Sequence, residues 1–141
     1  MLDSLRNTLV QRYAEREMNG LTAVKTMKPI VLIINAADAA NYISENKRVL
    51  DTYKDIVKKY KGLKSLIIFT NIENENISYS SPEVLKMMKD NYQFIVFDDL
   101  SSVKLFDCPL SLLKKFKTPI KEHEAYFLSG SDLKKIKTVL H

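Results

Sequence analysis

The sequence predicts an α/β fold in which a mainly parallel sheet is flanked by helices and followed by a C-terminal β-hairpin. Three short apolar runs, at residues 30–34, 63–70 and 92–99, alternate with segments of helical spacing, and this order is typical of βαβ units. The first run, IVLII, shows no polar alternation, as expected of a strand that is covered on both faces. At 141 residues the chain fits a single domain, 1–141.

The first helix is predicted from an apolar stripe near the start of the chain. Leu2, Leu5, Leu9 and Tyr13 recur at helical spacing, so they fall on one face of a helix. The Asn-Gly pair at 19–20 tolerates the left-handed conformation that closes helices, so we expect this helix to end there.

A second, longer helix is predicted between the first two strands. It runs through Tyr42 and continues to Tyr60, and the Lys-Gly pair at 61–62 ends it. Its apolar residues keep helical spacing: Ile43, Val49, Leu50, Tyr53, Ile56 and Val57. The strand at 63–70 then follows, so this helix is the crossover of a βαβ unit.

The second half of the chain is predicted to hold two short helices and a hairpin. Ser81 has the position of an N-cap and Pro82 that of a first helical residue. A strand follows at 92–99, and residues 109–116 allow one or two helical turns. Residues 124–140 predict two strands joined by the four-residue turn SGSD.

The composition narrows the classes of function. The net charge of +5 suits an acidic partner or nucleic acid, but lysines scattered over solvated faces are the commoner cause, and we expect no nucleic-acid partner. The longest apolar run, 30–34, is too short to span a bilayer, so no direct membrane insertion is expected. The single cysteine, Cys108, excludes an internal disulfide and is expected to pack as a small apolar residue.

Residues for catalysis or for holding a cofactor are not apparent in the sequence. Gly20, Gly62 and Gly130 belong to no GxxxxGK[ST] or GxGxxG loop, so the chain alone is not expected to hydrolyse ATP. His123 and His141 are too few for a metal site without further ligands. We therefore predict no catalytic residue, no metal and no cofactor.

Several segments resemble a known family. The helix LRNTLVQRYAEREMNG and the Pro-led strand in KPIVLIINAADAANYI resemble the third, C-terminal ATPase module of the FtsK/SpoIIIE-type motor of type VII secretion, the EssC family. KGLKSLIIFTN is similar to that family's next strand, and EAYFLSGSDLKKIKTVLH to its terminal hairpin. The resemblance covers nearly the whole chain, and it implies a P-loop-NTPase-like fold that is truncated.

The chain departs from this family at the residues that carry its chemistry. Asn35, Ala36 and Asp38 stand in the Walker B region, where the strand would end in an Asp that helps hold Mg²⁺ and an acid that orients water. Asn35 and Ala36 replace these acids, and Asp38 comes late, with the position of a helix N-cap. The Walker A half is absent, and residues 121–124 replace a Gly-Arg-Gly segment. The resemblance thus implies a degenerate module, as a fragment or a short relative.

The resemblance implies a non-catalytic recognition or regulatory module of a protein secretion motor. The implied partners are secreted helical proteins of the WXG100 type or neighbouring modules of the motor, and an exposed strand edge can also make a homo-oligomer. The implied location is the cytosolic part of a membrane-anchored bacterial complex. A candidate partner surface is formed by Leu85, Met87 and Met88 with the polar loop 72–81, although core packing also explains the methionines.

Two other functions fit the same residues. The chain can be a stand-alone α/β interaction protein, such as an immunity protein or an adaptor, and a tight complex with an unrelated toxin would favour this. It can also be a module that still binds nucleotide when the missing phosphate loop is supplied elsewhere, and detectable binding of Mg-ATP would favour that.

Overall fold

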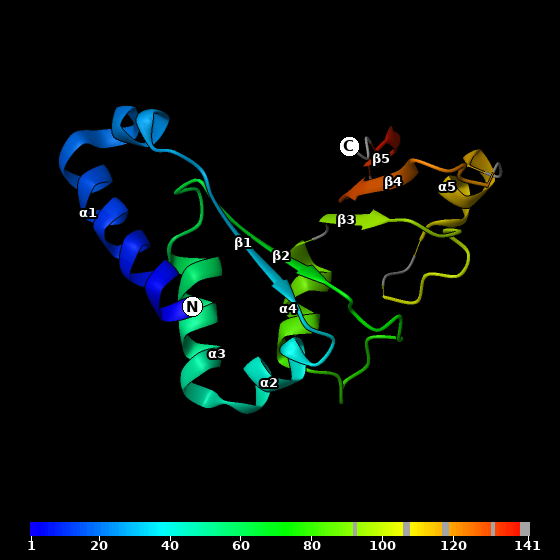
Figure 1. Cartoon of the computed structure of the whole chain (residues 1–141), viewed down its shortest axis with the longest axis horizontal. Helices are drawn as coiled ribbons and strands as arrows, with labels where there is room; N and C mark the ends of the chain where they lie inside the picture. Colours follow the sequence, from blue (N-terminus) through cyan, green and yellow to red (C-terminus); the bar gives the residue numbers. More distant parts are fainter. Residues whose placement is uncertain (92, 106–107, 117–118, 131, 139–141) are drawn as a thin grey trace. The chain divides into compact units, whose positions relative to one another are not determined.

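The computed structural model describes residues 1–91, 93–105, 108–116, 119–130 and 132–138 (Figure 1). The chain forms two compact units, Met1–Ile72 and Glu73–His141, which we call unit 1 and unit 2. That the two units form one domain stays a prediction. In the described part of the chain, no helix combines the length and the apolar character needed to cross a bilayer.

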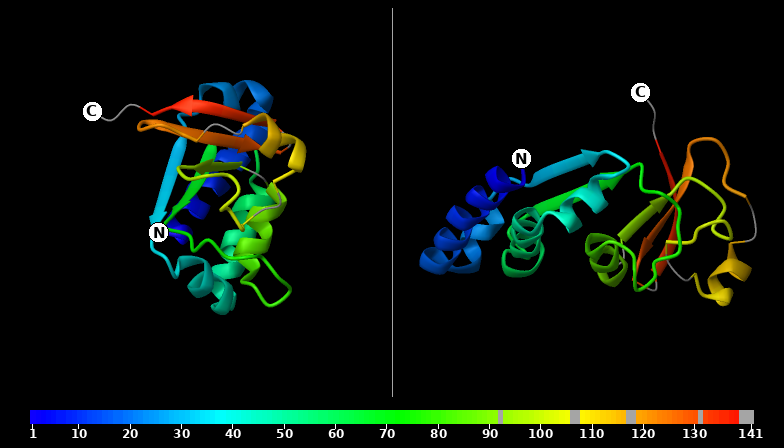
Figure 2. Two further views of the ribbon diagram at one scale, coloured as in Figure 1. Left: turned by 90° about the vertical axis from the view of Figure 1, so that its right-hand side faces the viewer. Right: turned by 90° about the horizontal axis from the view of Figure 1, so that it is seen from below.

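Unit 1 is built around two parallel strands, β1 (Ile30–Asn35) and β2 (Ser65–Thr70). The crossover between them holds the helices α2 (Ala39–Glu45) and α3 (Lys47–Lys54), and then a π-helical turn, η1 (Asp55–Lys59). The long helix α1 (Leu2–Thr26) precedes β1. Figure 2 shows these helices on one face of the strand pair. The predicted βαβ unit is thus confirmed.

The two strands of unit 1 have an inner and an outer face. Burial alternates along both strands, and the register places Val31 beside Leu66 and Ile33 beside Ile68 on the outer face. The helices cover the inner face, where the core of unit 1 includes Leu5, Leu9, Ile34, Ile43, Tyr53, Ile56, Tyr60 and Leu63. The prediction that the first strand is covered on both faces is therefore wrong for the structure of this unit. Its continuous apolar run supplies side chains to both faces, but the helices pack on one of them.

The predicted helix boundaries of unit 1 need two corrections. Gly20 leaves the helical conformation at φ 70° and ψ −167°, but the helix resumes beyond it as far as Thr26, so the predicted stop is a kink. The long crossover helix is interrupted at Asn46, whose extended backbone separates α2 from α3. The Asn46 side chain accepts a hydrogen bond from the Val49 N–H at 3.3 Å and so caps α3.

Unit 2 contains an antiparallel sheet in the order β3-β4-β5. Its elements are α4 (Glu83–Asn91), β3 (Gln93–Val96), α5 (Leu110–Lys115), β4 (Glu124–Ser129) and β5 (Asp132–Lys137). The β4–β5 hairpin confirms the predicted turn, because Ser129 pairs with Asp132. The prediction of a single, mainly parallel sheet is wrong. β3 pairs antiparallel with β4, because the hairpin offers it an antiparallel partner.

The core of unit 2 lies against this sheet. One cluster of buried residues consists of Leu100, Tyr126, Leu128 and Leu133. Phe116 packs edge-to-face on Tyr126, with ring centroids 5.8 Å apart. Cys108 packs against the same core, and burial raises the pKa of its thiol, which keeps it away from the reactive thiolate form.

Candidate functional site

The carboxyl ends of β1 and β2 meet at Asn35, as parallel pairing requires. The Asn35 side-chain oxygen accepts hydrogen bonds from the Thr70 hydroxyl at 2.8 Å and from the side-chain amide nitrogen of Asn71 at 2.7 Å. Asn71 has φ 57°, in the left-handed region that asparagine tolerates better than most residues. Both acceptor positions of Asn35 are thus used to join the two strand ends. Sequence reasoning missed Thr70 and Asn71, although their place after the second parallel strand puts them at the same sheet edge.

The other two residues of the predicted Walker B region lie in the link from β1 to α2. The Ala36 carbonyl accepts the Ala39 N–H at 3.2 Å, and the Asp38 carbonyl accepts the Tyr42 N–H at 2.9 Å. Asp38 holds the predicted N-cap position, but its side chain makes no capping bond in the described structure. The structure therefore shows Ala36 and Asp38 turning the chain from strand to helix.

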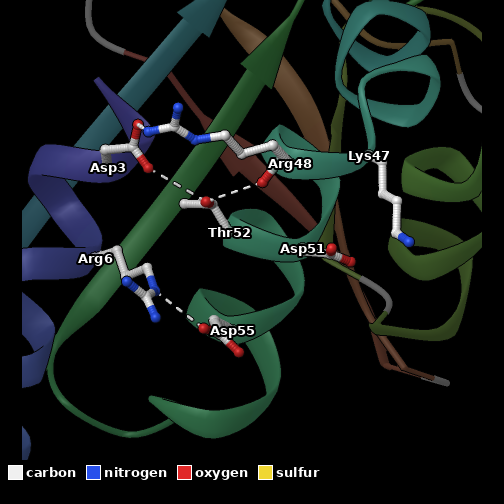
Figure 3. Close-up of a pocket in the computed structure, with 7 residues that line it drawn as sticks. All are labelled: Asp3, Arg6, Lys47, Arg48, Asp51, Thr52 and Asp55. Atoms are coloured by element: carbon white, nitrogen blue, oxygen red, sulfur yellow. Dashed lines mark hydrogen bonds and ion pairs between the residues drawn. The ribbon is translucent and has the colours of Figure 1, made fainter.

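A polar hollow of about 550 Å³ opens between the start of α1 and α3 (Figure 3). Seven residues line it: Asp3, Arg6, Lys47, Arg48, Asp51, Thr52 and Asp55. Three carry a negative and three a positive charge, so the lining has no net charge with which to collect an ion. Among the described residues, no group of three or more acidic, histidine or cysteine side chains is placed to hold a metal.

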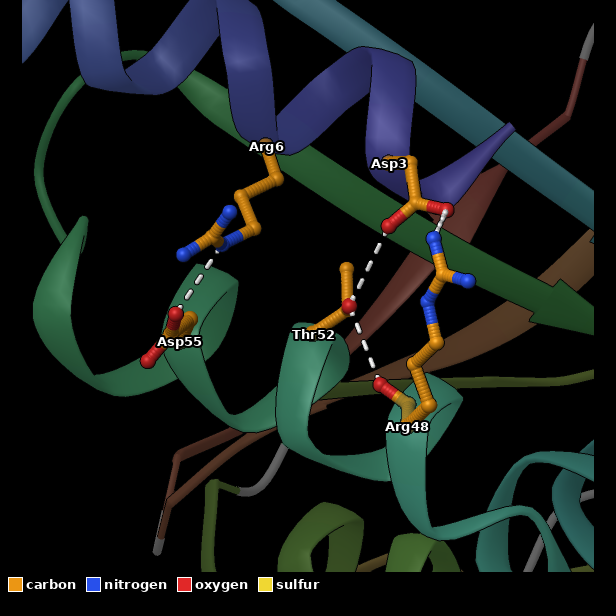
Figure 4. A network of polar contacts seen from close by, with 5 residues as sticks. All are labelled: Asp3, Arg6, Arg48, Thr52 and Asp55. Carbon is orange, nitrogen blue, oxygen red and sulfur yellow. Dashed lines mark hydrogen bonds and ion pairs between the residues drawn. The ribbon is translucent and has the colours of Figure 1, made fainter.

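The contacts across this hollow connect α1 with α3 and η1 (Figure 4). Arg6 Nε donates to Asp55 Oδ2 at 2.9 Å, and Arg48 lies 3.7 Å from Asp3. The Thr52 hydroxyl lies 3.3 Å from Asp3 Oδ1 and 3.1 Å from the Arg48 carbonyl. Because these ion pairs are partly or largely exposed, each contributes roughly 0–1 kcal/mol, which is a small addition to the core packing of α1.

A second, smaller hollow of about 280 Å³ shares Asp3, Arg48 and Thr52 with the first. Its other lining residues are Met1, Leu2, Ile34, Ala39, Tyr42, Ile43 and Val49. Most of these are apolar, and Tyr42 is exposed. This hollow lies beside the carboxyl end of β1, where open α/β sheets commonly bind their ligands.

The most unusual surface of unit 1 is the outer face of its strand pair. Val31 (53% exposed), Ile33 (59%), Leu66 (47%) and Ile68 (37%) form two neighbouring cross-strand pairs there, which we call the open face. Asn35 and Thr70 form the next pair and end the open face in polar groups. Aliphatic side chains gathered in this way mark interaction sites more often than single exposed ones do.

The predicted partner surface lies on α4 in unit 2. Met87 is buried, so it does not contribute to an open surface, whereas Leu85 and Met88 are half-buried. In the polar loop 72–81, the Tyr79 ring is exposed and the Lys86 ammonium lies 5.3 Å from its centroid. A role of this segment in partner binding stays a prediction.

The fold and the site together define an α/β protein with a parallel strand pair that is covered by helices on one face. Neither a protein-family model nor a curated protein sequence matches the chain. The resemblance to the third ATPase module of type VII secretion motors therefore depends on the sequence segments alone and stays a prediction.

Proposed function

We propose that the chain is a non-catalytic interaction module that binds an amphipathic helix of another protein on the open face. The observation that carries this proposal is the set of four exposed aliphatic side chains, Val31, Ile33, Leu66 and Ile68. Parallel strands in α/β proteins are usually covered on both faces, and helices are the usual cover. In unit 1 the helices occupy one face, so a helix from a partner fits as the missing layer.

The open face also defines the chemistry of this partner helix. Its contact side presents aliphatic residues at helical spacing to the pairs Val31–Leu66 and Ile33–Ile68. Near one end it presents hydrogen-bonding side chains toward Asn35 and Thr70. The four aliphatic side chains are already about half buried, so covering them contributes roughly 1 kcal/mol each. This is small beside the cost of association, so the polar end must contribute to both affinity and orientation.

The resemblance suggests which proteins provide such a helix. The first candidate is a secreted helical-hairpin protein of the WXG100 type, and the second is a neighbouring module of the motor. In that setting, the chain works as a recognition or regulatory module on the cytosolic side of a membrane-anchored secretion complex. Asn35 and Ala36 provide no acid at the Walker B positions, which supports a role without ATP turnover.

The open face is tested with a lysine substitution. The full chain is titrated with a purified WXG100-type protein in a calorimeter, and Ile33→Lys is expected to weaken binding at least tenfold. The matched control is Leu110→Lys, which changes an exposed leucine of unit 2 in the same way. Circular dichroism and thermal unfolding check that both variants fold. Equal binding by Ile33→Lys and the unchanged chain would reject the open face as the site.

The non-catalytic part of the proposal has its own assay. The chain is incubated with Mg-ATP, alone and with the partner, and release of inorganic phosphate is followed. We expect no release above the rate of a buffer blank. Turnover that disappears when Asn35 and Thr70 are replaced by alanine would instead show an active nucleotide site at the strand ends.

A further inference from the structure

The excess of positive over negative charge lies in unit 1. Residues 1–72 hold 12 lysines and arginines and 7 aspartates and glutamates, whereas residues 73–141 hold ten of each kind. The net charge of +5 therefore belongs to unit 1. Within this unit, the segments 18–37 and 56–72 contain lysines and no acidic residue.

Four of these lysines lie near the end of unit 1 where β1 and β2 begin. Lys25, Lys28, Lys61 and Lys64 are all exposed. The Lys64 ammonium donates to the Lys25 carbonyl at 2.6 Å, which brings the end of α1 beside the start of β2. Arg12 donates to the carbonyls of Lys28 at 2.6 Å and of Leu63 at 2.9 Å, so the two chain segments are held together. We call this region, with the kinked end of α1, the lysine tip.

The lysine tip also exposes large apolar side chains. Leu21 is 76% exposed and Met18 is 77% exposed, on either side of the kink at Gly20. Leu21 and Lys25 are four residues apart in the helical segment after the kink, so they share its outward face. Ala23 is buried on the opposite side of the same segment, and Met27, which follows the helix, is also buried.

We propose that the lysine tip adsorbs to an anionic lipid surface without spanning it. Lysines attract lipid phosphates as point charges and need no fixed partner geometry, whereas close pairing with protein carboxylates is better served by arginine. Leu21 and Met18 then enter the interface between headgroups and acyl chains, as the apolar face of a surface-bound helix does. A polyanion without an apolar surface would satisfy the lysines but would leave these two side chains in water.

Vesicle co-sedimentation of the full chain tests this proposal. One set of vesicles is phosphatidylcholine alone and the other is phosphatidylcholine mixed with phosphatidylglycerol. We expect binding to the mixed vesicles only, and weaker binding as salt shortens the screening length to about 8 Å at physiological ionic strength. Equal binding to both kinds of vesicle, or sedimentation with neither at low salt, would overturn the proposal.

Matched variants locate the binding surface. The triple variant Lys25→Glu, Lys28→Glu and Lys61→Glu is expected to bind the mixed vesicles more than about tenfold more weakly, since each lysine near the surface contributes to attraction. The control, Lys104→Glu, Lys114→Glu and Lys121→Glu, makes the same change of charge at exposed lysines of unit 2. An equal loss in both triple variants would show a general charge effect and would overturn the assignment to the tip.

The apolar contribution is measured separately. Leu21→Ser is expected to weaken binding several-fold at a given salt concentration, whereas Leu110→Ser, an equally exposed leucine of unit 2, leaves it unchanged. No effect of Leu21→Ser would reject insertion of the apolar side chains. Binding of the chain to double-stranded DNA or polyaspartate, but not to the mixed vesicles, would assign the lysine tip to another polyanion and reject the lipid surface.

Discussion

The side chains of Asn35 and Thr70 are joined across β1 and β2 by a hydrogen bond of 2.8 Å at the carboxyl ends of the strands. The sequence resemblance predicts that Asn35 takes the position of a Walker B acid that helps hold Mg²⁺. The amide oxygen of Asn35 also accepts from Asn71, so the position joins the strand ends. At this strand end the Asn35 amide therefore makes a structural contact.

This role of Asn35 predicts two different outcomes for two substitutions. Asn35→Ala removes an acceptor from Thr70 and Asn71 and is expected to lower the free energy of unfolding by about 1 kcal/mol. Asn35→Asp keeps an acceptor for both donors, so its stability at neutral pH should stay close to that of the unchanged chain. Urea unfolding measures both. An equal loss in the two variants would show that the hydrogen bonds are not the cause.

Arg12 is expected to be important for the stability of unit 1. Its half-buried guanidinium donates to carbonyls before both strands, so Arg12→Ala should cost about 2 kcal/mol in unfolding free energy. Arg12→Lys should recover only part of this loss. An ammonium can still donate to a carbonyl, but it lacks the planar fork with which the guanidinium reaches two segments. The control is Arg16→Ala, which loses an exposed pair with Glu17 and a contact with the Tyr13 ring. It should cost less than about 1 kcal/mol, and a cost equal to that of Arg12→Ala would contradict this role.

Gly20 predicts a cost that arises from the backbone alone. A Cβ at this position would have no atom within 4 Å, but φ of 70° with ψ of −167° is a conformation that is essentially restricted to glycine. Gly20→Ala should therefore lower the free energy of unfolding by about 1–3 kcal/mol. Asn19→Ala, at the exposed neighbouring residue, should leave it nearly unchanged. Thermal unfolding compares the two, and a neutral Gly20→Ala would show that the kink is easily straightened.

Tyr53 makes stability sensitive to alkaline pH. Burial raises its pKa to about 12, above the ordinary value of 10.0, and its ring packs edge-to-face on Phe69. The unfolded chain loses this proton first, so the contribution of Tyr53 is fully present below pH 10 and falls as pH rises toward 12. This decrease in unfolding free energy amounts to at most roughly 2–3 kcal/mol, and it should be absent from Tyr53→Phe. Urea unfolding between pH 9 and pH 12 measures the difference, with Tyr42→Phe at an exposed ring as control.

Local patterns were enough to predict much of the fold. Two apolar runs separated by a helical segment predicted the parallel pair β1–β2, and SGSD predicted the hairpin that the pairing of Ser129 with Asp132 confirms. The direction of β3 was not predictable in the same way, because a short apolar strand pairs in either direction and the choice depends on a partner distant in sequence. In the same way, a continuous apolar run does not reveal whether its second face is covered.

The candidate site was predictable only in part. The sheet edge at Asn35 follows from the end of an apolar strand, but its contact with Thr70 depends on the register between two strands. The open face depends on where the helices pack, which spacing within a single helix does not determine. The kink at Gly20 was located correctly but interpreted as a stop, because the sequence beyond it carries no strong helical pattern.

The open face has a consequence for how the protein behaves at high concentration. Val31, Ile33, Leu66 and Ile68 lie on a two-stranded sheet whose outer edges have no strand neighbour within unit 1. Exposed aliphatic strands with free edges are templates for aggregation. The concentration at which the chain stays soluble thus depends on the amount of partner that binds this face. Chain made in excess of that partner becomes a substrate for chaperones and proteases.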